Sequence, residues 1–291
     1  NGFLYGGTED GKILKITKSE SEEKIEEFAA TGGRPLGLDF DSSGNLWIAD
    51  ARKGLLRVTP SGKVEVMTST AEGGDFGFTD DVEAASDGMV YFSDASTKWG
   101  LKDYLFDALE ARPYGRLLAY DPAKNETRVL LKDLYFANGI ALSQAEDFVL
   151  VNETYRYRIT RYWLKSPKAG EHDVFIDNLP GFPDGVSSDG KGTFWVAMFT
   201  VRNKLADAIH PHPFIKKIAA SLPKFLQPKP EPYGLALAID ENGKILESLH
   251  DPGGKIFPEV TSAEPYGDFL YLGTLHRYGI CRYRLPQSSQ P

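Results

Sequence analysis

The chain is poor in cysteine, and no long apolar run occurs in it. Cys281 is the single thiol among 291 residues, which excludes an intrachain disulfide and a cysteine-based metal cluster. No stretch approaches the roughly 18 consecutive apolar residues that a membrane-spanning helix requires, so no span is expected in this chain. The opening residues from Asn1 do not have the pattern of a signal peptide either, and we expect further residues upstream of them. These observations leave the cellular compartment open.

Basic residues are also scarce relative to acidic ones. The chain carries 33 Lys and Arg against 41 Asp and Glu, a formal net charge of −8. Surfaces that bind phosphate backbones draw on clustered Lys and Arg, and no basic stripe occurs here. We therefore expect no nucleic-acid partner, whereas a cation and a small-molecule substrate are compatible with this charge. Nothing in the composition indicates an oligomeric state.

What the chain does contain favours strands and turns. Hydrophobic residues make up 41% and aromatic residues 12%, with 29 Gly and 18 Pro, a globular mixture rich in strand and turn formers. Five segments repeat one pattern: an apolar strand, a turn of Gly, Asp or Ser, and a second strand rich in aromatic or β-branched residues. They begin at Pro35, Thr79, Ala137, Pro183 and Val260.

Each repeat continues into a third strand and usually a fourth, which makes it a four-stranded meander. Repeats of about 40 to 50 residues with four strands each are typical of β-propellers. With the incomplete opening unit the count is six, so the predicted fold is an all-β, six-bladed β-propeller formed by residues 1–291 as a single domain. The first blade lacks its first strand and the last its fourth, which predicts closing strands upstream of Asn1.

Two insertions interrupt this pattern, at about residues 96–115 and 201–234. Apolar residues recur in both at helical spacing, which predicts two short helical lids. The residues are Leu101, Tyr104, Leu105 and Ala108 in the first insertion, and Phe214, Ile215, Ile218 and Leu222 in the second. In a meander the loop after the second strand shares a face with the start of the first strand. We therefore expect the functional site on the face that carries both lids.

Polar residues occupy the same register position at the start of several inner strands. This position holds Leu36, Asp80, Asn138, Asp184 and Thr261, so three consecutive blades direct Asp, Asn and Asp toward the axis. Converging oxygen ligands suit a hard cation such as Ca²⁺. Asx residues before glycine are also ordinary turn and strand-entry residues. The pattern alone leaves both interpretations open.

Further candidates lie on the same predicted face. His276 is placed to shuttle protons because imidazole titrates near neutral pH, although a packed or surface histidine is the alternative. Glu153 ends a second strand there and could either support a neighbouring site residue or contact substrate. Trp99, Phe106 and Phe214 lie on the lids, where they either pack against the rim or line an apolar substrate pocket.

Several of these motifs together resemble the strictosidine-synthase-like proteins. The motifs are "FANGIALS" with Asn138, "NETYRYRITRYWLK" from Asn152, "LPGFPDGV" with Asp184, "HDPGG" from His250 and "YLGTL" from Tyr271. That family is grouped with the gluconolactonase, paraoxonase and diisopropylfluorophosphatase propellers, and the resemblance covers nearly the whole chain.

The resemblance implies a six-bladed propeller with a divalent cation, usually Ca²⁺, in its central tunnel. Carried over by motif, two of the family's ligands fall on Asn138 and Asp184. Asp80 stands where the hydrolytic relatives have an asparagine, a departure that adds negative charge. The glutamate ligand of blade one would lie before Asn1.

Our preferred hypothesis is a metal-dependent hydrolase of lactones, aryl esters or phosphotriesters. Asp80, Asn138 and Asp184 would hold the ion, Asp184 would also attack or activate water, and His276 would move protons. One alternative is amine–aldehyde condensation, for which the family uses a glutamate at the place occupied here by Thr261. A non-catalytic binding scaffold is the other, since fold does not determine function.

Overall fold

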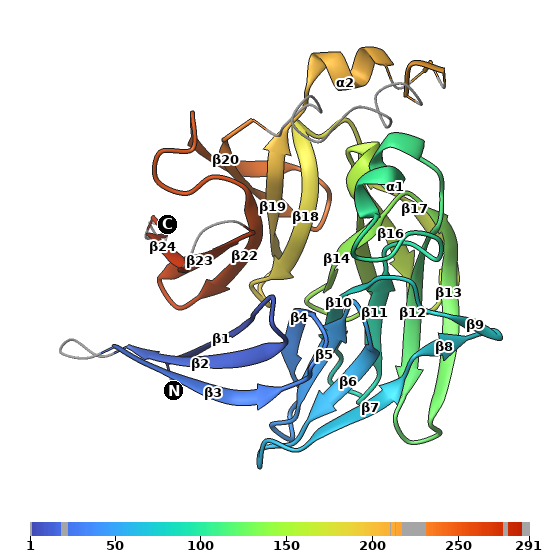
Figure 1. Cartoon of the computed structure of the whole chain (residues 1–291), viewed down its shortest axis with the longest axis vertical. Coiled ribbons are helices and arrows are strands. Elements are labelled where there is room, and N and C mark those ends of the chain that lie inside the picture. Colours follow the sequence, from blue (N-terminus) through green and yellow to red (C-terminus); the bar gives the residue numbers. More distant parts are fainter. Residues whose placement is uncertain are drawn as a thin grey trace. The chain divides into compact units, whose positions relative to one another are not determined.

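The sheets of this protein follow the predicted repeat. The computed structural model describes residues 2–18, 23–209, 211–212, 214–216, 231–275 and 279–286. It is a mostly-β, six-bladed propeller with few short helices (Figure 1), which confirms the predicted fold class. Contacts divide the chain into unit 1, residues 1–104 and 113–137, and unit 2, residues 105–112 and 138–291. A single domain over 1–291 stays a prediction.

Unit 1 contains the first three blades. Its strands are β1 (Phe3–Gly7), β2 (Lys12–Lys18), β3 (Glu23–Ala30), β4 (Pro35–Phe40), β5 (Leu46–Asp50), β6 (Gly54–Val58), β7 (Val64–Thr68), β8 (Thr70–Ala71), β9 (Gly74–Asp75), β10 (Thr79–Ala84), β11 (Val90–Asp94), β12 (Gly115–Asp121) and β13 (Glu126–Leu134). The order β1-β2-β3 forms a three-stranded sheet, and β4 to β7 and β10 to β13 form four-stranded sheets. The hairpin β8-β9 is an addition that the repeat does not predict.

Unit 2 contains the other three blades, the second insertion and residues 105–112 of the first. Its elements are α1 (Tyr104–Glu110), β14 (Ala137–Leu142), β15 (Phe148–Glu153), the 3-10 turn η1 (Thr154–Arg156), β16 (Arg158–Trp163), β17 (His172–Ile176), β18 (Gly181–Ser188), β19 (Thr193–Val201), α2 (Lys204–Ile209), β20 (Gly234–Asp240), β21 (Ile245–Asp251), β22 (Val260–Tyr266), β23 (Phe269–Thr274) and β24 (Cys281–Arg284). No helix in the described part of the chain is long and apolar enough to cross a membrane.

The second strand of each complete blade before the large insertion is buried along its whole length. Every residue of β5, β11 and β15 is buried. Such strands read as continuous apolar runs rather than alternating ones. Each run ends in an acid that is completely buried: Asp50, Asp94 and Glu153. These acids need partners, since a buried charge is costly without them.

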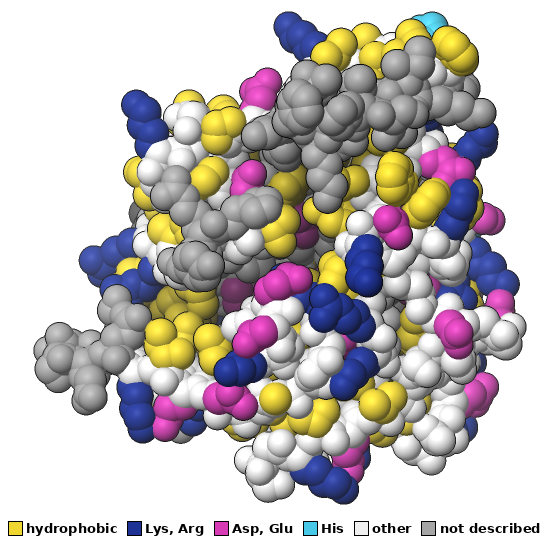
Figure 2. Space-filling view, viewed as in Figure 1, with side chains coloured by type: hydrophobic (Ala, Val, Ile, Leu, Met, Phe, Trp, Pro, Cys, Tyr) yellow, Lys and Arg dark blue, Asp and Glu magenta, His cyan; other side chains and the backbone are white. Residues whose placement is uncertain are grey.

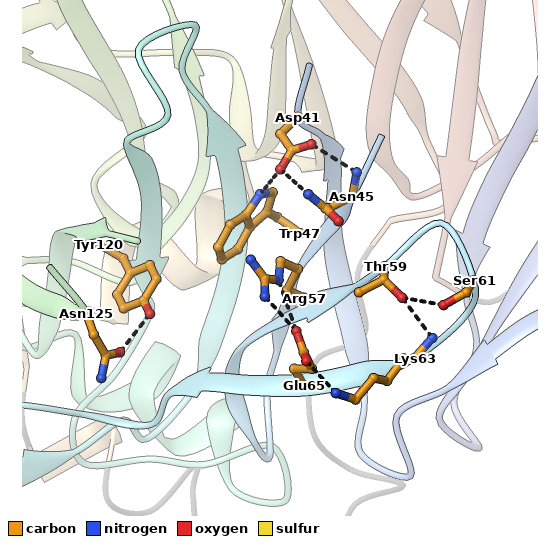
Figure 3. Close-up of polar contacts among 10 residues, drawn as sticks. All are labelled: Asp41, Asn45, Trp47, Arg57, Thr59, Ser61, Lys63, Glu65, Tyr120 and Asn125. Atoms are coloured by element: carbon orange, nitrogen blue, oxygen red, sulfur yellow. Dashed lines mark hydrogen bonds and ion pairs between the residues drawn. The ribbon is translucent and has the colours of Figure 1, made fainter. Parts of the chain in front are cut away.

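Acids in the hairpins of unit 1, whether in a turn or on a strand, have structural explanations (Figure 3). Asp41, between β4 and β5, accepts a hydrogen bond from the indole Nε1 of Trp47 at 3.0 Å. On the next hairpin, Glu65 accepts from Lys63 at 2.9 Å and from Arg57 at 2.7 Å. The hydrogen bonds from Lys63 and Arg57 lower the pKa of Glu65 to about 2. An acid in a turn of this fold is therefore not by itself a sign of a functional site.

Candidate functional site

The inner strands of unit 2 begin side by side. A Cβ atom on Gly139 would lie 2.5 Å from the carbonyl oxygen of Asp184, and a Cβ on Gly185 would lie 2.6 Å from the carbonyl oxygen of Thr261. Only glycine permits such close backbone approach. Because each glycine directly follows a predicted site residue, the backbones at Asn138, Asp184 and Thr261 lie close together on neighbouring inner strands. Asp184 is the fourth residue of β18, so it does not open its strand as the sequence predicts.

The inner strand of blade five bulges where Asp184 lies. Along β18 and β19, Pro183 pairs with Met198 and Val186 pairs with Val196, so three steps on β18 oppose two on its partner. A β-bulge of this kind removes residues from the ladder and redirects their side chains, and bulges are common next to active sites. On β22 the extra residue is Thr261, since Val260 pairs with Thr274 and Ser262 with Gly273. These two β-bulges could not be predicted from the sequence.

Two side chains from blade four hold the β18 bulge. Asn152 Nδ2 donates to the Asp184 carbonyl oxygen at 2.6 Å, and Thr154 Oγ1 donates to the Pro183 carbonyl oxygen at 2.7 Å. Asn152 is completely buried, and Asn138 is 7% exposed. Neither Asn152 nor Thr154 was predicted to belong to the site. One sequence feature could have indicated them: the apolar strand β15 ends in the polar run "NET", which continues into η1.

The predicted cation ligands of unit 2 are the carboxylate of Asp184 and the amide oxygen of Asn138. No cluster of three or more His, Cys, Asp or Glu side chains occurs among the residues that the structure describes. Carboxylate and amide oxygens are nevertheless ligands that hard cations accept. Asn138 and Asp184 are thus the two predicted ligands that the structure brings together on adjoining strands.

Asp80, the third predicted ligand, belongs to unit 1 and also lies at a bulge. Thr79 pairs with Asp94 and Val82 with Phe92, which leaves Asp80 and Asp81 as the bulged residues of β10. The bulge is held by Ser93 Oγ, which accepts from the Asp81 amide at 2.9 Å. A common cation site of Asp80 with Asn138 and Asp184 stays a prediction.

Glu153 is occupied within its own blade. It is completely buried, and its Oε1 accepts from Arg158 Nε at 2.7 Å and from Thr160 Oγ1 at 2.6 Å. Both partners lie on β16, so these bonds tie the end of β15 to the next strand. These bonds support a structural role for Glu153. Its contact with substrate stays a prediction.

The first insertion forms the predicted helix, but with a different buried face. In α1 the buried residue is Asp107, whereas Leu105 is 52% and Phe106 39% exposed. Leu105 belongs to the apolar face that the helical spacing predicts, but this face is not the buried one at that residue. Trp99 lies in unit 1, half-buried, with the Lys98 ammonium 4.9 Å from its ring centroid.

In the second insertion the helix α2 begins before the predicted one. Phe214 is 75% and Leu205 60% exposed, and apolar side chains cover the surface around α2 (Figure 2). Lys216 Nζ donates to the Glu110 carbonyl oxygen at 3.1 Å, so the two insertions touch within unit 2. Burial, followed by the charge of Arg112, lowers the pKa of Lys216. Predicted lid positions 218 and 222, and His276, lie outside the described residues.

A polar cluster fastens α2 to blade four. The Tyr157 hydroxyl donates to Asp207 Oδ1 at 2.9 Å, and Arg202 pairs with Asp207 Oδ2 at 3.1 Å. Arg202 also donates to Asn178 Oδ1 at 2.6 Å and lies over the Tyr157 ring, 4.4 Å from its centroid. Burial, assisted by the hydrogen bond to Asp207, raises the pKa of Tyr157. Tyr157 therefore keeps its proton and acts as a donor.

Replacing Tyr157 with phenylalanine should loosen this fastening. The variant loses one hydrogen bond to a charged acceptor, and we expect the free energy of unfolding to fall by about 1–2 kcal/mol, with faster proteolytic cleavage at α2. Urea denaturation and timed proteolysis would measure both. Tyr120→Phe is the matched control, since it loses a 2.8 Å bond to Asn125 in unit 1. Equal cleavage rates at α2 in both variants would contradict the assigned role.

One hollow of about 350 Å³ lies entirely in unit 1. Its lining includes Thr68, Glu72, Tyr120 and Asn125. None of the predicted site residues lines it, so it adds nothing to the candidate site.

Known proteins match this chain over most of its length. The strictosidine synthase family model matches residues 80–167. Protein STRICTOSIDINE SYNTHASE-LIKE 6 of Arabidopsis thaliana is 37% identical over 98% of this chain and 76% of its own length. The adipocyte plasma membrane-associated protein of Bos taurus is 37% identical over 97% of this chain and 73% of its own length.

Solved structures support the same architecture at lower identity. A gluconolactonase from Xanthomonas campestris superposes with a TM-score of 0.64 at 15% identity, over 91% of this chain and 76% of that one. Regucalcin from Agrobacterium tumefaciens, a calcium-binding protein, gives 0.62 at 16% identity, over 90% and 74%. Identities this low establish the fold alone, whereas the similarity to the plant and animal proteins shows that this chain belongs to the strictosidine synthase-like family.

Proposed function

We propose that this protein is a metal-dependent hydrolase of small esters, lactones or phosphotriesters. One observation carries the proposal: Asp184 lies in a bulge whose backbone is held by Asn152 and Thr154, next to β14, which carries Asn138. A bulge secured by two buried donors holds a carboxylate in one place, which a catalytic or ligand group requires. A turn aspartate such as Asp41 serves the turn that it closes and needs no such support.

The donors in unit 2 fit a hard divalent cation, and Ca²⁺ is our choice. Asn138 and Asp184 supply an amide and a carboxylate oxygen, and Ca²⁺ accepts such mixed oxygen ligands in loose geometry. The buried Oδ1 of Asn152 has no hydrogen-bond partner among the described residues, so the neighbourhood of Asp184 retains acceptor capacity. When bound, a cation of this kind supplies Lewis-acid polarisation of a carbonyl or phosphoryl oxygen. The calcium bound by regucalcin makes this ion a reasonable first trial.

Asp184 has two compatible roles in hydrolysis. Asp184 is half-buried, and its carboxylate projects from a backbone that Asn152 and Thr154 hold. That carboxylate either attacks the electrophilic centre directly or takes a proton from the attacking water. His276 is the proposed proton carrier, and Phe106 and Phe214 supply apolar surface for the substrate on the two insertions. The gluconolactonase among the structural neighbours is consistent with a lactone substrate.

Amine–aldehyde condensation finds less support in this chain. The bulged inner-strand position of the last blade holds Thr261, a residue without an acid group. Glu264 lies three residues further along β22 and is exposed, while Glu259 precedes the strand. Neither glutamate occupies the bulge that corresponds to Asp184 in blade five.

The exposed apolar side chains of the insertions favour a second candidate, a non-catalytic binding scaffold. Leu205 and Phe214 are 60% and 75% exposed, and apolar surface of this kind also serves protein partners. The assay below separates the two candidates.

Turnover should depend on a bound divalent cation. We expect the purified protein to hydrolyse at least one of phenyl acetate, a γ-lactone and paraoxon, to lose this activity with a chelator and to recover it with Ca²⁺. Adding Mg²⁺ instead of Ca²⁺ is the control. Mg²⁺ should restore less of the activity because it requires near-ideal octahedral geometry. Activity that chelation does not change, or no turnover of any of the three, would contradict the proposal and favour the scaffold.

A further inference from the structure

The side chain of Asn152 stands out among the buried polar groups of unit 2. It is completely buried at the end of β15, and its Nδ2 donates to the Asp184 carbonyl oxygen at 2.6 Å. The acceptor is a carbonyl, so the nitrogen must point toward it, and the amide orientation follows from chemistry. Oδ1 therefore points elsewhere.

That second atom of the amide is unsatisfied. Asn152 Oδ1 is one of the few buried side-chain atoms without a hydrogen-bond partner among the described residues. A buried acceptor left unpaired costs free energy. If the only role of Asn152 were to donate to the Asp184 carbonyl, the unpaired oxygen would be a cost without a benefit. We therefore expect a bound group to supply the missing donor.

Neighbouring contacts show that this end of β15 serves the β18 bulge. Thr154 follows two residues later and donates to the Pro183 carbonyl oxygen at 2.7 Å. Two consecutive carbonyls of β18, those of Pro183 and Asp184, are thus held from blade four. The same principle recurs in unit 1, where Ser93 on β11 holds the amide of bulged Asp81 at 2.9 Å.

We propose that Asn152 is a positioning residue for the cation that Asp184 holds. It fixes the backbone from which the carboxylate projects, and its Oδ1 accepts a hydrogen bond from water that accompanies the cation. This inference rests on the cation site of the proposed function. Groups that orient ligands usually change metal affinity by 10- to 100-fold when they are removed.

Direct cation binding tests the proposal. Asn152→Leu keeps the volume of the side chain but removes donor and acceptor, and we expect its Ca²⁺ affinity to fall about 10- to 100-fold. Thr154→Val, which is nearly isosteric, should weaken binding in the same direction and provides a second test if Asn152→Leu fails to fold. Calorimetry with Ca²⁺ and Tb³⁺ luminescence give affinity without reference to catalysis.

Asn45→Leu is the matched control. Asn45 Nδ2 donates to Asp41 Oδ2 at 2.9 Å in unit 1, so this variant also loses an asparagine hydrogen bond. Urea denaturation without cation should show a loss of stability in both leucine variants, and only Asn152→Leu should lose affinity. If wild-type protein binds Ca²⁺ and the folded Asn152 and Thr154 variants bind it equally well, the inference is wrong and the cation site stands. If wild-type protein binds no Ca²⁺, both the site and the inference fall.

Discussion

Replacing Asp184 with asparagine is expected to reduce hydrolysis and Ca²⁺ affinity by about 100-fold or more. The substitution keeps the size of the side chain and the backbone carbonyl that Asn152 holds. What it removes is the only predicted carboxylate ligand of unit 2, which is also the proposed base or nucleophile. Steady-state kinetics and Ca²⁺ calorimetry on the same preparation would measure both losses.

The control for this variant lies in the same blade. Asp189 closes the turn between β18 and β19 by accepting from the amides of Lys191 at 2.7 Å and Thr193 at 2.9 Å. Asp189→Asn makes the same chemical change at a turn, so it should leave Ca²⁺ affinity and turnover within about twofold of wild type, as expected for a screened charge at a distance. An Asp184→Asn variant that bound Ca²⁺ like wild type would reduce Asp184 to a strand-entry residue.

Replacing Arg116 with leucine is expected to destabilise the protein by about 3–5 kcal/mol. Arg116 pairs with the completely buried Asp94 through Nε at 3.1 Å and Nη2 at 2.5 Å. Asp94 also accepts from the amides of Gly77 at 3.1 Å and Phe78 at 2.9 Å. Without the guanidinium the Asp94 carboxylate stays buried with these two neutral amide donors. Removing one partner of a buried ion pair is costly because it leaves the other charge uncompensated. Urea denaturation would measure the change.

A double variant separates charge from packing at this ion pair. Asp94→Asn combined with Arg116→Leu removes both charges, while the asparagine oxygen can still accept from Gly77 and Phe78. We expect this double variant to recover a large part of the stability that Arg116→Leu alone loses. Should Arg116→Leu cost less than about 1 kcal/mol, the value of an exposed pair, Asp94 would have to be satisfied by its amide donors alone.

Local patterns were sufficient to predict the blades. The alternation of apolar strands with Gly, Asp and Ser turns depends on neighbouring residues, so it identified the strands that became β4, β10, β14, β18 and β22. The helix in the first insertion was also predicted from spacing. Its orientation was not, because spacing does not show that the surroundings of α1 accept the carboxylate of Asp107 and leave Leu105 half exposed.

The residues that support the site could not be found in this way. Glu153 was predicted to support a site residue or to contact substrate because it ends a strand on the expected face. That its carboxylate lies beside Arg158 and Thr160 follows from the register of β15 with β16. Pairing across a hairpin depends on register, and a sequence pattern gives register only where a turn determines it.

The sequence by itself determined the class of fold, the family and the polar inner-strand positions of Asn138 and Asp184, because strand alternation and turn chemistry act over a few residues. Only the tertiary structure decided how Asp184 is held. Its β-bulge and its hydrogen bond to Asn152, 32 residues away along the chain, arise when neighbouring blades pack. The physical reason is that a buried backbone carbonyl released from the ladder must find a donor, and packing determines which side chain supplies it.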